Sequence, residues 1–221
     1  MTTEWVDAGG PAAGARPPLP DAVTGPRVIA IARRLDPDSL ARIADGLLGG
    51  GVRAFEVTLD SAGAVEAIAA LTDRFADSDL VVGAGTVLDA DAARAAVAAG
   101  ARFIVSPHTD PAIVAAAREL GVPAFPGALT PTEVVTAWRA GASGVKVFPV
   151  SAVGPSFVRE LRGPLRDVPL IPTGGVSLDN APALIAAGAV AVGVGSWLIG
   201  DGDPDGIAGR GASLVGALAR A

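Results

Sequence analysis

The chain has 221 residues, a formal net charge of −6 and a hydrophobic fraction of 50%, which suits a globular protein with one large core. Its acidic balance argues against a nucleic-acid-binding or anionic-membrane surface, although a local positive pocket can still bind small anions. The absence of cysteine excludes disulfides, thiolate nucleophiles and cysteine-ligated metals, and the single histidine, His108, argues against a histidine metal centre. No signal peptide or membrane-spanning stretch is evident, so we expect a cytoplasmic protein.

Residues 1–26 are rich in proline, glycine and alanine and show no sustained periodicity. This composition predicts a loosely ordered leader with a short helical piece near its end. From Arg27 onwards, apolar stretches alternate with helical patterns. We therefore place a single folded domain at residues 27–221.

This domain reads as eight strand–helix units of about 20–25 residues each, the period of a (β/α)8 barrel. Most strand stretches are continuously apolar, as expected of parallel strands that are buried on both faces. A doubly wound sheet is the competing α/β fold, but its phosphate fingerprint would follow the first strand. The sequence therefore predicts a TIM barrel with strands at 28–33, 53–59, 80–87, 102–107, 123–128, 144–149, 169–175 and 191–196, and helices at 36–48, 64–71, 89–99, 110–120, 131–141, 155–162, 178–188 and 204–220.

The stretch Gly144–Pro149 contains Lys146, the only lysine of the chain. Its neighbours in sequence are β-branched or aromatic. In an apolar environment an amine can become a neutral nucleophile, whereas a guanidinium cannot. Lys146 is thus a candidate nucleophile, and the alternative is a strand-end lysine that reaches solvent or pairs with a carboxylate.

Glu56 lies within an otherwise apolar strand, F-E-V-T-L. A buried carboxylate is costly unless it is paired or functional. A buried glutamate with a raised pKa can act as a proton shuttle, and the alternative is an ion pair with Arg33 or Arg53.

Two glycine-rich turns follow the last two predicted strands, T-G-G at 173–175 and V-G-V-G-S at 192–196. Their backbone N–H groups are unobstructed by side chains and are suited to bind a phosphate. In barrels of this class the phosphate site lies after these two strands, so the sequence predicts one here.

Several segments occur together in a recognisable order: F-E-V-T-L (55–59), V-G-A-G-T-V (82–87), F-I-V-S-P-H (103–108), F-P-G-A-L-T-P-T-E (125–133), V-K-V-F-P (145–149), P-T-G-G-V (172–176) and G-V-G-S-W-L (193–198). With them, the stretch from about Arg27 to Arg220 resembles the bacterial 2-keto-3-deoxy-6-phosphogluconate (KDPG) and 4-hydroxy-2-oxoglutarate (KHG) aldolases. The family consists of small homotrimeric class I aldolase barrels of carbohydrate metabolism, including the Entner–Doudoroff pathway.

The resemblance implies that Lys146 forms a Schiff base with the C2 ketone of a 2-keto acid and that Glu56 moves protons. No metal or organic cofactor is implied, because the protonated imine is the electron sink. The resemblance also implies substrate-binding residues: Arg33, Thr86 and Thr173 near the carboxylate or the bound keto acid, Gly174, Gly175, Gly195 and Ser196 at the phosphate, and Pro107 and Phe148 as walls around the pyruvyl group.

The chain departs from the family at Asp60, where many members have arginine in a V-T-L-R pattern. An acid cannot bind an anion there, so anion recognition would depend more on Arg33 or on the backbone loops. His108 varies in the family and is expected to line the pocket rather than to catalyse.

The leading hypothesis is a lyase that cleaves KDPG to pyruvate and glyceraldehyde 3-phosphate, and also KHG to pyruvate and glyoxylate. One alternative is a 2-dehydro-3-deoxy-6-phosphogalactonate aldolase. The others are a sugar-phosphate isomerase or epimerase on the same barrel, and a non-catalytic trimeric module. Neither of the last two needs an amine at Lys146 that borohydride can trap as an imine.

Overall fold

The computed structural model describes residues 15–34 and 36–221 of the chain. Helices and strands alternate along it, and each predicted strand or helix overlaps an observed one, which confirms the α/β alternation. Two short elements were not predicted, a 3-10 helix at Val150–Ala152 and a helix at Ser196–Ile199. The elements in chain order are α1 (Asp21–Thr24), β1 (Val28–Ala32), α2 (Pro37–Gly49), β2 (Ala54–Thr58), α3 (Ala64–Arg74), β3 (Val81–Gly85), α4 (Ala90–Ala98), β4 (Ile104–Val105), α5 (Pro111–Glu119), β5 (Ala124–Phe125), β6 (Gly127–Ala128), α6 (Pro131–Ala140), β7 (Val145–Val147), α7 (Gly154–Arg162), β8 (Leu170–Pro172), α8 (Ala181–Ala186), β9 (Val192–Val194), α9 (Ser196–Ile199) and α10 (Pro204–Leu218).

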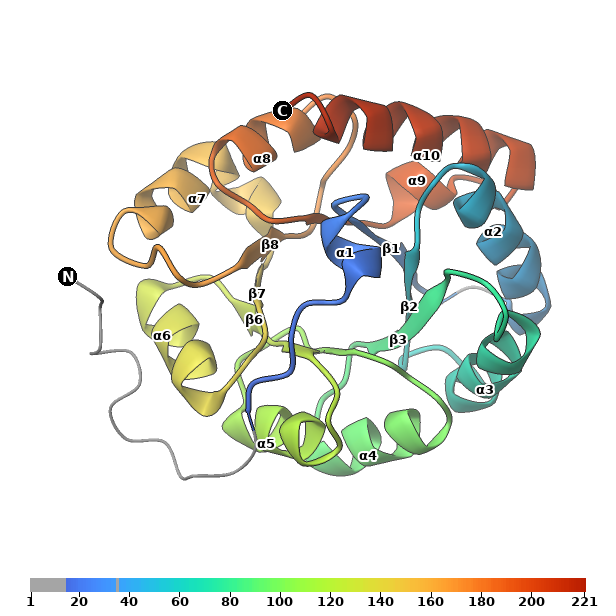
Figure 1. Cartoon of the computed structure of the whole chain (residues 1–221), viewed down its shortest axis with the longest axis horizontal. Coiled ribbons are helices and arrows are strands. Elements are labelled where there is room, and N and C mark those ends of the chain that lie inside the picture. Colours follow the sequence, from blue (N-terminus) through green and yellow to red (C-terminus); the bar gives the residue numbers. More distant parts are fainter. Residues whose placement is uncertain (1–14, 35) are drawn as a thin grey trace.

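The strands form two parallel sheets, a curled six-stranded sheet with the order β5-β4-β3-β2-β1-β9 and a three-stranded sheet with the order β6-β7-β8. Figure 1 shows the strands gathered around the centre of the molecule and the helices on the outside. The stretch predicted as one strand at 123–128 is divided into β5 and β6 by Pro126. Because proline has no N–H to donate, it interrupts a hydrogen-bonded ladder at this point.

Successive residues of each strand point to opposite sides of the sheet. Residues on one side pack against the surrounding helices in a large core cluster. On the other side, Phe103 and Phe125 approach each other with ring centroids 5.8 Å apart. Gly83 leaves room for them, since a Cβ there would lie 2.3 Å from the Phe103 ring. This inner cluster consists of Val23, Ile29, Ala54, Phe103, Val105, Phe125, Ile171 and Ala191.

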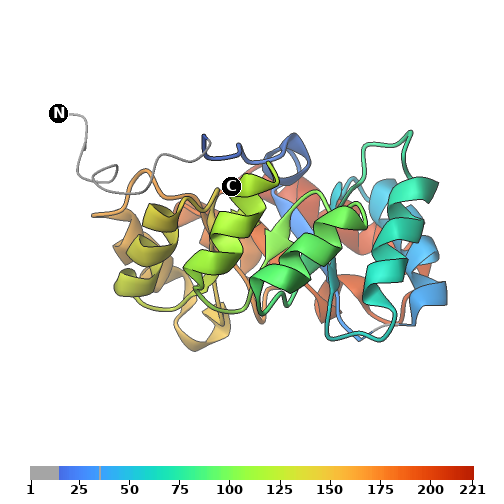
Figure 2. The ribbon, with the colours of Figure 1, turned by 90° about the horizontal axis from the view of Figure 1, so that it is seen from below.

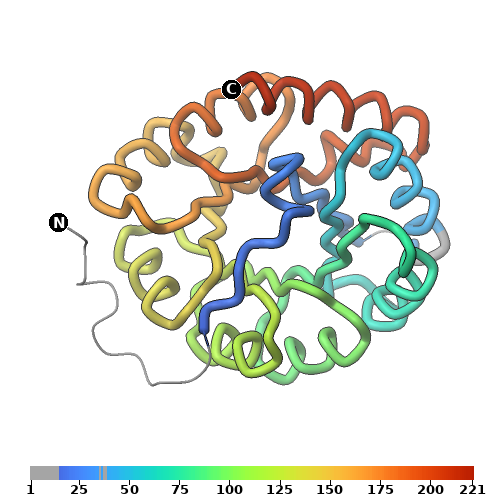
Figure 3. Tube along the Cα trace, in the orientation of Figure 1, coloured from blue at the N-terminus to red at the C-terminus, as the bar shows by residue number. Residues whose placement is uncertain are grey.

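Residues 15–26 cross the molecule at the amino-terminal ends of the strands, as the blue trace in Figures 1 and 3 shows. In the side view of Figure 2, the same segment lies along one edge of the molecule. Val23 of α1 is completely buried in the inner cluster. The Ser143 hydroxyl donates to the Pro17 carbonyl at 2.6 Å, and the Arg16 guanidinium lies 3.2 Å from the centre of the Trp138 ring.

The predicted short helix near the end of the leader corresponds to α1. The prediction of a loosely ordered leader does not hold for residues 15–26, because these residues fill the space that the strands leave open at their amino ends. The folded unit thus begins before Arg27, while residues 1–14 lie outside the described residues.

Helix starts follow the capping chemistry of the sequence. Asp89, Asp110 and Asp203 each accept a hydrogen bond from a backbone N–H in the first turn of α4, α5 and α10. Thr130 begins α6 with a capping box, in which its hydroxyl and the Glu133 carboxylate each bind the other residue's backbone N–H. Within the described ranges, no helix is long and apolar enough to cross a membrane.

Candidate active site

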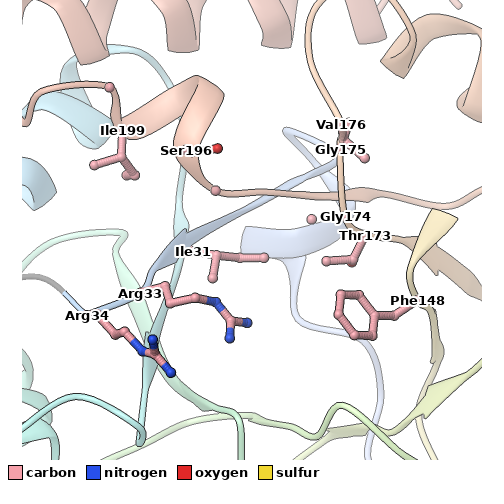
Figure 4. Close-up of a pocket in the computed structure, with 13 residues that line it drawn as sticks. Ile31, Arg33, Arg34, Phe148, Thr173, Gly174, Gly175, Val176, Ser196 and Ile199 are labelled. Carbon is pink, nitrogen blue, oxygen red and sulfur yellow. The ribbon is translucent and has the colours of Figure 1, made fainter. Parts of the chain in front are cut away.

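A cavity of about 530 Å³ opens at the carboxyl ends of β1, β7, β8 and β9. Parallel strands bring their carboxyl ends to the same side of a sheet, so residues that follow different strands meet there. Figure 4 shows the Arg33 side chain extending towards Thr173 and Phe148 across this space. The cavity is lined by Ile31, Arg33, Arg34, Phe148, Thr173, Gly174, Gly175, Val176, Gly193, Gly195, Ser196, Ile199 and Gly200.

The structure brings together seven residues predicted from the sequence, namely Arg33, Phe148, Thr173, Gly174, Gly175, Gly195 and Ser196. Thr86 and Pro107 follow β3 and β4, which are separated from the cavity by β2, and neither lines it. His108, expected as pocket lining, is exposed and does not contribute to this cavity. Lys146 and Glu56 also lie outside its lining, because both are buried within their strands.

Lys146 is the central residue of β7 and is 3% exposed. It shares a face of the strand with Phe148, two residues later, and its Nζ lies 5.0 Å from the centre of the Phe148 ring. On β8 its register partner is Ile171, which precedes Thr173 by the same two-residue step. Lys146 therefore points to the side of the sheet from which the cavity opens, one step closer to the amino ends. Among the described residues it forms no ion pair, contrary to the structural alternative considered for it.

Glu56 occupies the centre of β2 and is 1% exposed. Its register partner on β1 is Ile31, which lines the cavity. Oε1 of Glu56 has no hydrogen-bond partner among the described residues. Burial raises the pKa of Glu56, while the nearby charges of Lys146 and Arg33 act to lower it. The carboxyl is thus buried, and its Oε1 is left without a hydrogen-bond partner among the described residues.

Glu56 does not form the ion pair with Arg33 or Arg53 that was its structural alternative. Arg33 forms its ion pair with Asp60, and Arg53 lies 3.9 Å from a carboxylate oxygen of Asp79. Space for the Glu56 carboxyl comes from Gly85 on the neighbouring strand, because a Cβ there would lie 1.8 Å from Oε1. Gly85 was not predicted as a site residue, since its relation to Glu56 depends on the register between β2 and β3.

Asp60 follows β2 and lies between the two arginines that follow β1. Its Oδ2 is 3.7 Å from Nη1 of Arg33 and 3.2 Å from Nε of Arg34. Partial burial acts to raise the pKa of Asp60, but the Thr58 hydroxyl and the two guanidinium groups outweigh it and hold the pKa below its usual value. Asp60 is therefore ionised at neutral pH and shares the charge of both arginines.

The turn after β8 depends on glycine. Gly174 and Gly175 have φ values of 95° and 73°, a left-handed conformation that residues with a Cβ rarely adopt. The Asn180 side chain holds this turn by donating to the Gly175 carbonyl at 2.8 Å and accepting from the Ser177 N–H at 3.0 Å. Asn180 was not predicted, although an asparagine near the start of a predicted helix is a common turn-stabilising signal.

Thr173 is 5% exposed, and the neighbouring strand accommodates it through Gly193, where a Cβ would lie 2.4 Å from the threonine Oγ1. Ile199 of α9 also lines the cavity but was missed because this short helix was not predicted. In the described part of the chain, no group of three or more His, Cys, Asp or Glu side chains is arranged to hold a metal ion.

The family model described as KDPG and KHG aldolase matches residues 21–205. A 2-dehydro-3-deoxy-phosphogluconate aldolase of Treponema pallidum is 40% identical over 173 residues, which cover 78% of this chain and 80% of the relative. A 2-dehydro-3-deoxy-6-phosphogalactonate aldolase of Escherichia coli is 35% identical over 172 residues, covering 77% and 83%.

Among solved structures, a KDPG aldolase of Legionella pneumophila with pyruvate captured as a covalent carbinolamine intermediate superposes with a TM-score of 0.76. It is 27% identical, and the match covers 90% of this chain and 95% of that one.

Proposed function

This chain belongs to the KDPG and KHG aldolase family, and from that premise we propose that it is a class I aldolase, a lyase that uses a Schiff base. Its principal reaction is the cleavage of KDPG to pyruvate and glyceraldehyde 3-phosphate, with the cleavage of KHG to pyruvate and glyoxylate as a second reaction. The observation that carries the proposal is the pair of buried groups, Lys146 and Glu56. They point to the side of the sheets from which the cavity opens and have no ion-pair partners among the described residues.

The proposed fold is a closed (β/α)8 barrel. Two contacts between the sheets support closure. On one side, β5 and β6 are separated by Pro126 alone, so a single stretch of chain pairs with β4 and with β7. On the other, Thr173 forms a parallel bridge with Gly193, which joins β8 to β9. Counting β5 and β6 as one, eight strand segments then surround the inner cluster.

The reaction begins when the unprotonated amine of Lys146 attacks the C2 ketone of the substrate and forms a carbinolamine. Glu56 donates a proton to the carbinolamine hydroxyl, which leaves as water, and the product is a protonated imine. Glu56, now a carboxylate, accepts the proton of the C4 hydroxyl, the C3–C4 bond breaks to leave the aldehyde, and the electron pair of that bond neutralises the protonated imine to give an enamine. The aldehyde leaves, Glu56 returns a proton to C3, and water hydrolyses the imine to release pyruvate.

The buried location of Glu56 suits this role, because burial raises the pKa of the carboxyl and so favours the protonated form that can donate a proton. Phe148 lines the cavity with its ring centre 5.0 Å from Nζ of Lys146, and this ring excludes water from the pyruvyl group. Water exclusion limits the premature hydrolysis of the imine.

The remaining predicted residues keep their roles as proposals. Arg33 attracts the anionic end of the substrate, and the phosphate lies against the backbone N–H groups of the turns after β8 and β9, at Gly174, Gly175, Gly195 and Ser196. Thr173 lines the cavity near the keto acid. For Thr86 and Pro107 the family resemblance is the support, since neither residue lines the cavity.

The test is borohydride trapping. The protein is incubated with pyruvate and sodium borohydride, and its intact mass is compared with that of Lys146→Met. Because Lys146 is the only lysine, the variant removes every lysine amine and retains an unbranched apolar side chain at the position. A reduced pyruvate adduct on the wild type, absent from a folded Lys146→Met variant, is the expected result. Failure of folded wild-type protein to trap pyruvate would overturn the proposal.

Cleavage of 2-dehydro-3-deoxy-6-phosphogalactonate is the second candidate, which the similarity to the E. coli enzyme of that name favours. The two substrates differ in configuration at C4, so the ratio of kcat/KM for the two epimers decides between the reactions. We also propose a homotrimer, which the family resemblance supports, and a cytoplasmic location; sedimentation equilibrium tests the assembly.

A further inference from the structure

Asp60 is close to the proposed substrate site without being part of its surface. Arg33 and Arg34 line the cavity, whereas Asp60 does not. One oxygen of Asp60, Oδ2, approaches both guanidinium groups, at 3.7 Å and 3.2 Å. Arg33 and Arg34 therefore present positive charge to the cavity, and Asp60, which lies outside the lining, partly neutralises this charge.

The loops that carry these three side chains are tied to each other. The backbone N–H of Arg34, which has a left-handed φ of 53°, donates to the Ser61 hydroxyl at 3.0 Å. The Thr58 hydroxyl donates to the Ala32 carbonyl at 3.1 Å. These bonds link the end of β2 to the end of β1, so the position of Asp60 relative to the arginines is set by the backbone.

The exposure of the three side chains indicates how the charges are shared. Asp60 is 22% exposed, whereas Arg33 and Arg34 are 48% and 76% exposed. The carboxylate is thus held in the protein, while the guanidinium groups reach towards the cavity and the solvent. An anion that enters the cavity must compete with Asp60 for Arg33.

We propose that Asp60 is a positioning and specificity-determining residue: by sharing the charge of Arg33 and Arg34, it lowers the preference of this site for a phosphorylated aldehyde over an uncharged one. The inference rests on the proposed function and deepens it by assigning Asp60 a part in the choice of aldehyde. A dianionic phosphate is repelled by Asp60 and is attracted by arginines whose charge is already partly satisfied. An uncharged aldehyde experiences neither effect.

Asp60→Asn removes the negative charge and keeps the size of the side chain. Because these groups are partly exposed, solvent screens the interaction, and we expect about a five- to tenfold increase in affinity for a phosphate monoester. The KM for glyceraldehyde 3-phosphate in aldol addition to pyruvate should fall by about the same factor, with the KM for glyceraldehyde unchanged.

The experiment compares the wild type with Asp60→Asn, Asp60→Glu and Asp45→Asn. Binding of glycerol 3-phosphate and of glycerol is measured by calorimetry, and both aldehydes are tested in the aldol direction. Asp60→Glu restores the charge and should return the wild-type ratio. Asp45 also pairs with an arginine, Arg74 at 3.0 Å, but neither residue lines the cavity, so Asp45→Asn should change nothing.

Unchanged or weaker binding of glycerol 3-phosphate by folded Asp60→Asn would overturn the inference, because Asp60 would then only orient Arg33. An equal change for both aldehydes would overturn it as well, since a purely structural effect does not distinguish them. The proposed function is tested separately by borohydride trapping and fails if the wild type forms no pyruvate adduct. Even then, the calorimetric comparison of glycerol 3-phosphate with glycerol decides the role of Asp60.

Discussion

The substitution Glu56→Gln should reduce catalysis and increase stability at the same time. Glutamine has nearly the same shape as glutamate but neither takes up nor releases a proton at the pH of the reaction. Loss of a general acid–base group typically lowers kcat by about 10²- to 10⁴-fold. The proposed mechanism uses Glu56 in three proton transfers, so we expect a loss towards the upper end of this range.

The gain in stability follows from the burial of the carboxyl. Burial raises the pKa of Glu56, so the folded state retains a proton that the unfolded chain releases above its ordinary pKa of about 4.3. The folded state binds more protons in this window, and the free energy of unfolding therefore falls as the pH rises.

Between that pKa and pH 7 the effect is at most about 3.7 kcal/mol, at about 1.4 kcal/mol for each pH unit. Lys146 and Arg33 favour the ionised carboxylate and reduce the effect. We expect the free energy of unfolding of Glu56→Gln to exceed that of the wild type by about 1–3 kcal/mol at pH 7 and to be nearly equal to it at pH 4.

The assay is urea unfolding of both proteins at several values between pH 4 and pH 8, together with steady-state kinetics of KDPG cleavage. Glu160→Gln, an exposed change on α7, is the matched control and should show neither effect. A pH-independent difference in stability would contradict the account of a buried, protonated carboxyl. Turnover within about threefold of the wild type would refute Glu56 as the proton carrier.

Three further substitutions test the packing around the site and the fold. In Gly85→Ala the new Cβ displaces the Glu56 carboxyl, so kcat/KM should fall by about 10- to 100-fold and the free energy of unfolding by about 1–3 kcal/mol. The control is Gly209→Ala in α10, where the new Cβ meets open space. This variant should be more stable than the wild type by about 0.5–1 kcal/mol, with unchanged kinetics. Val23→Ala should lower the free energy of unfolding by about 1–3 kcal/mol and leave kcat unchanged, because its side chain is buried at the amino ends of the strands; loss of activity in the folded variant would contradict this separation. Hydrogen bonds from the Leu129 and Thr130 N–H groups and from the Thr130 hydroxyl lower the pKa of Glu133, so its stabilisation is present above the unfolded pKa and is lost as the pH falls. Because Glu133 is exposed and solvent screens its charge, Glu133→Gln should cost at most about 0.5 kcal/mol at pH 7 and less at pH 3, as measured by thermal melts at both values.

Local patterns within the sequence predicted much of this protein. The alternation of apolar strands and helical patterns was readable because it depends on residues that are close in the chain. Lys146 and Glu56 stood out for the same reason: each is an ionisable residue within a short apolar strand, and both proved to be buried. The helix predicted at 131–141 corresponds to α6, whose start is fixed by a capping box that is contained within four successive residues.

The relations between strands could not be read in this way. Gly85 gives Glu56 its space, and Gly193 does the same for Thr173, through registers between strands whose residues are distant in sequence. Thr86 and Pro107 seemed equivalent to Phe148 as strand-end residues, yet the positions of β3 and β4 in the sheet separate them from the cavity.

The sequence by itself therefore determined the order of helices and strands, the candidate nucleophile and the buried carboxyl, because side-chain periodicity and burial are local properties of a strand or helix. Only the tertiary structure decided that Asp60 would pair with Arg33 and Arg34, and that Val23 would close the amino ends of the strands. Those contacts depend on how the sheets curl and which strand ends become neighbours, and no stretch of sequence contains that information alone.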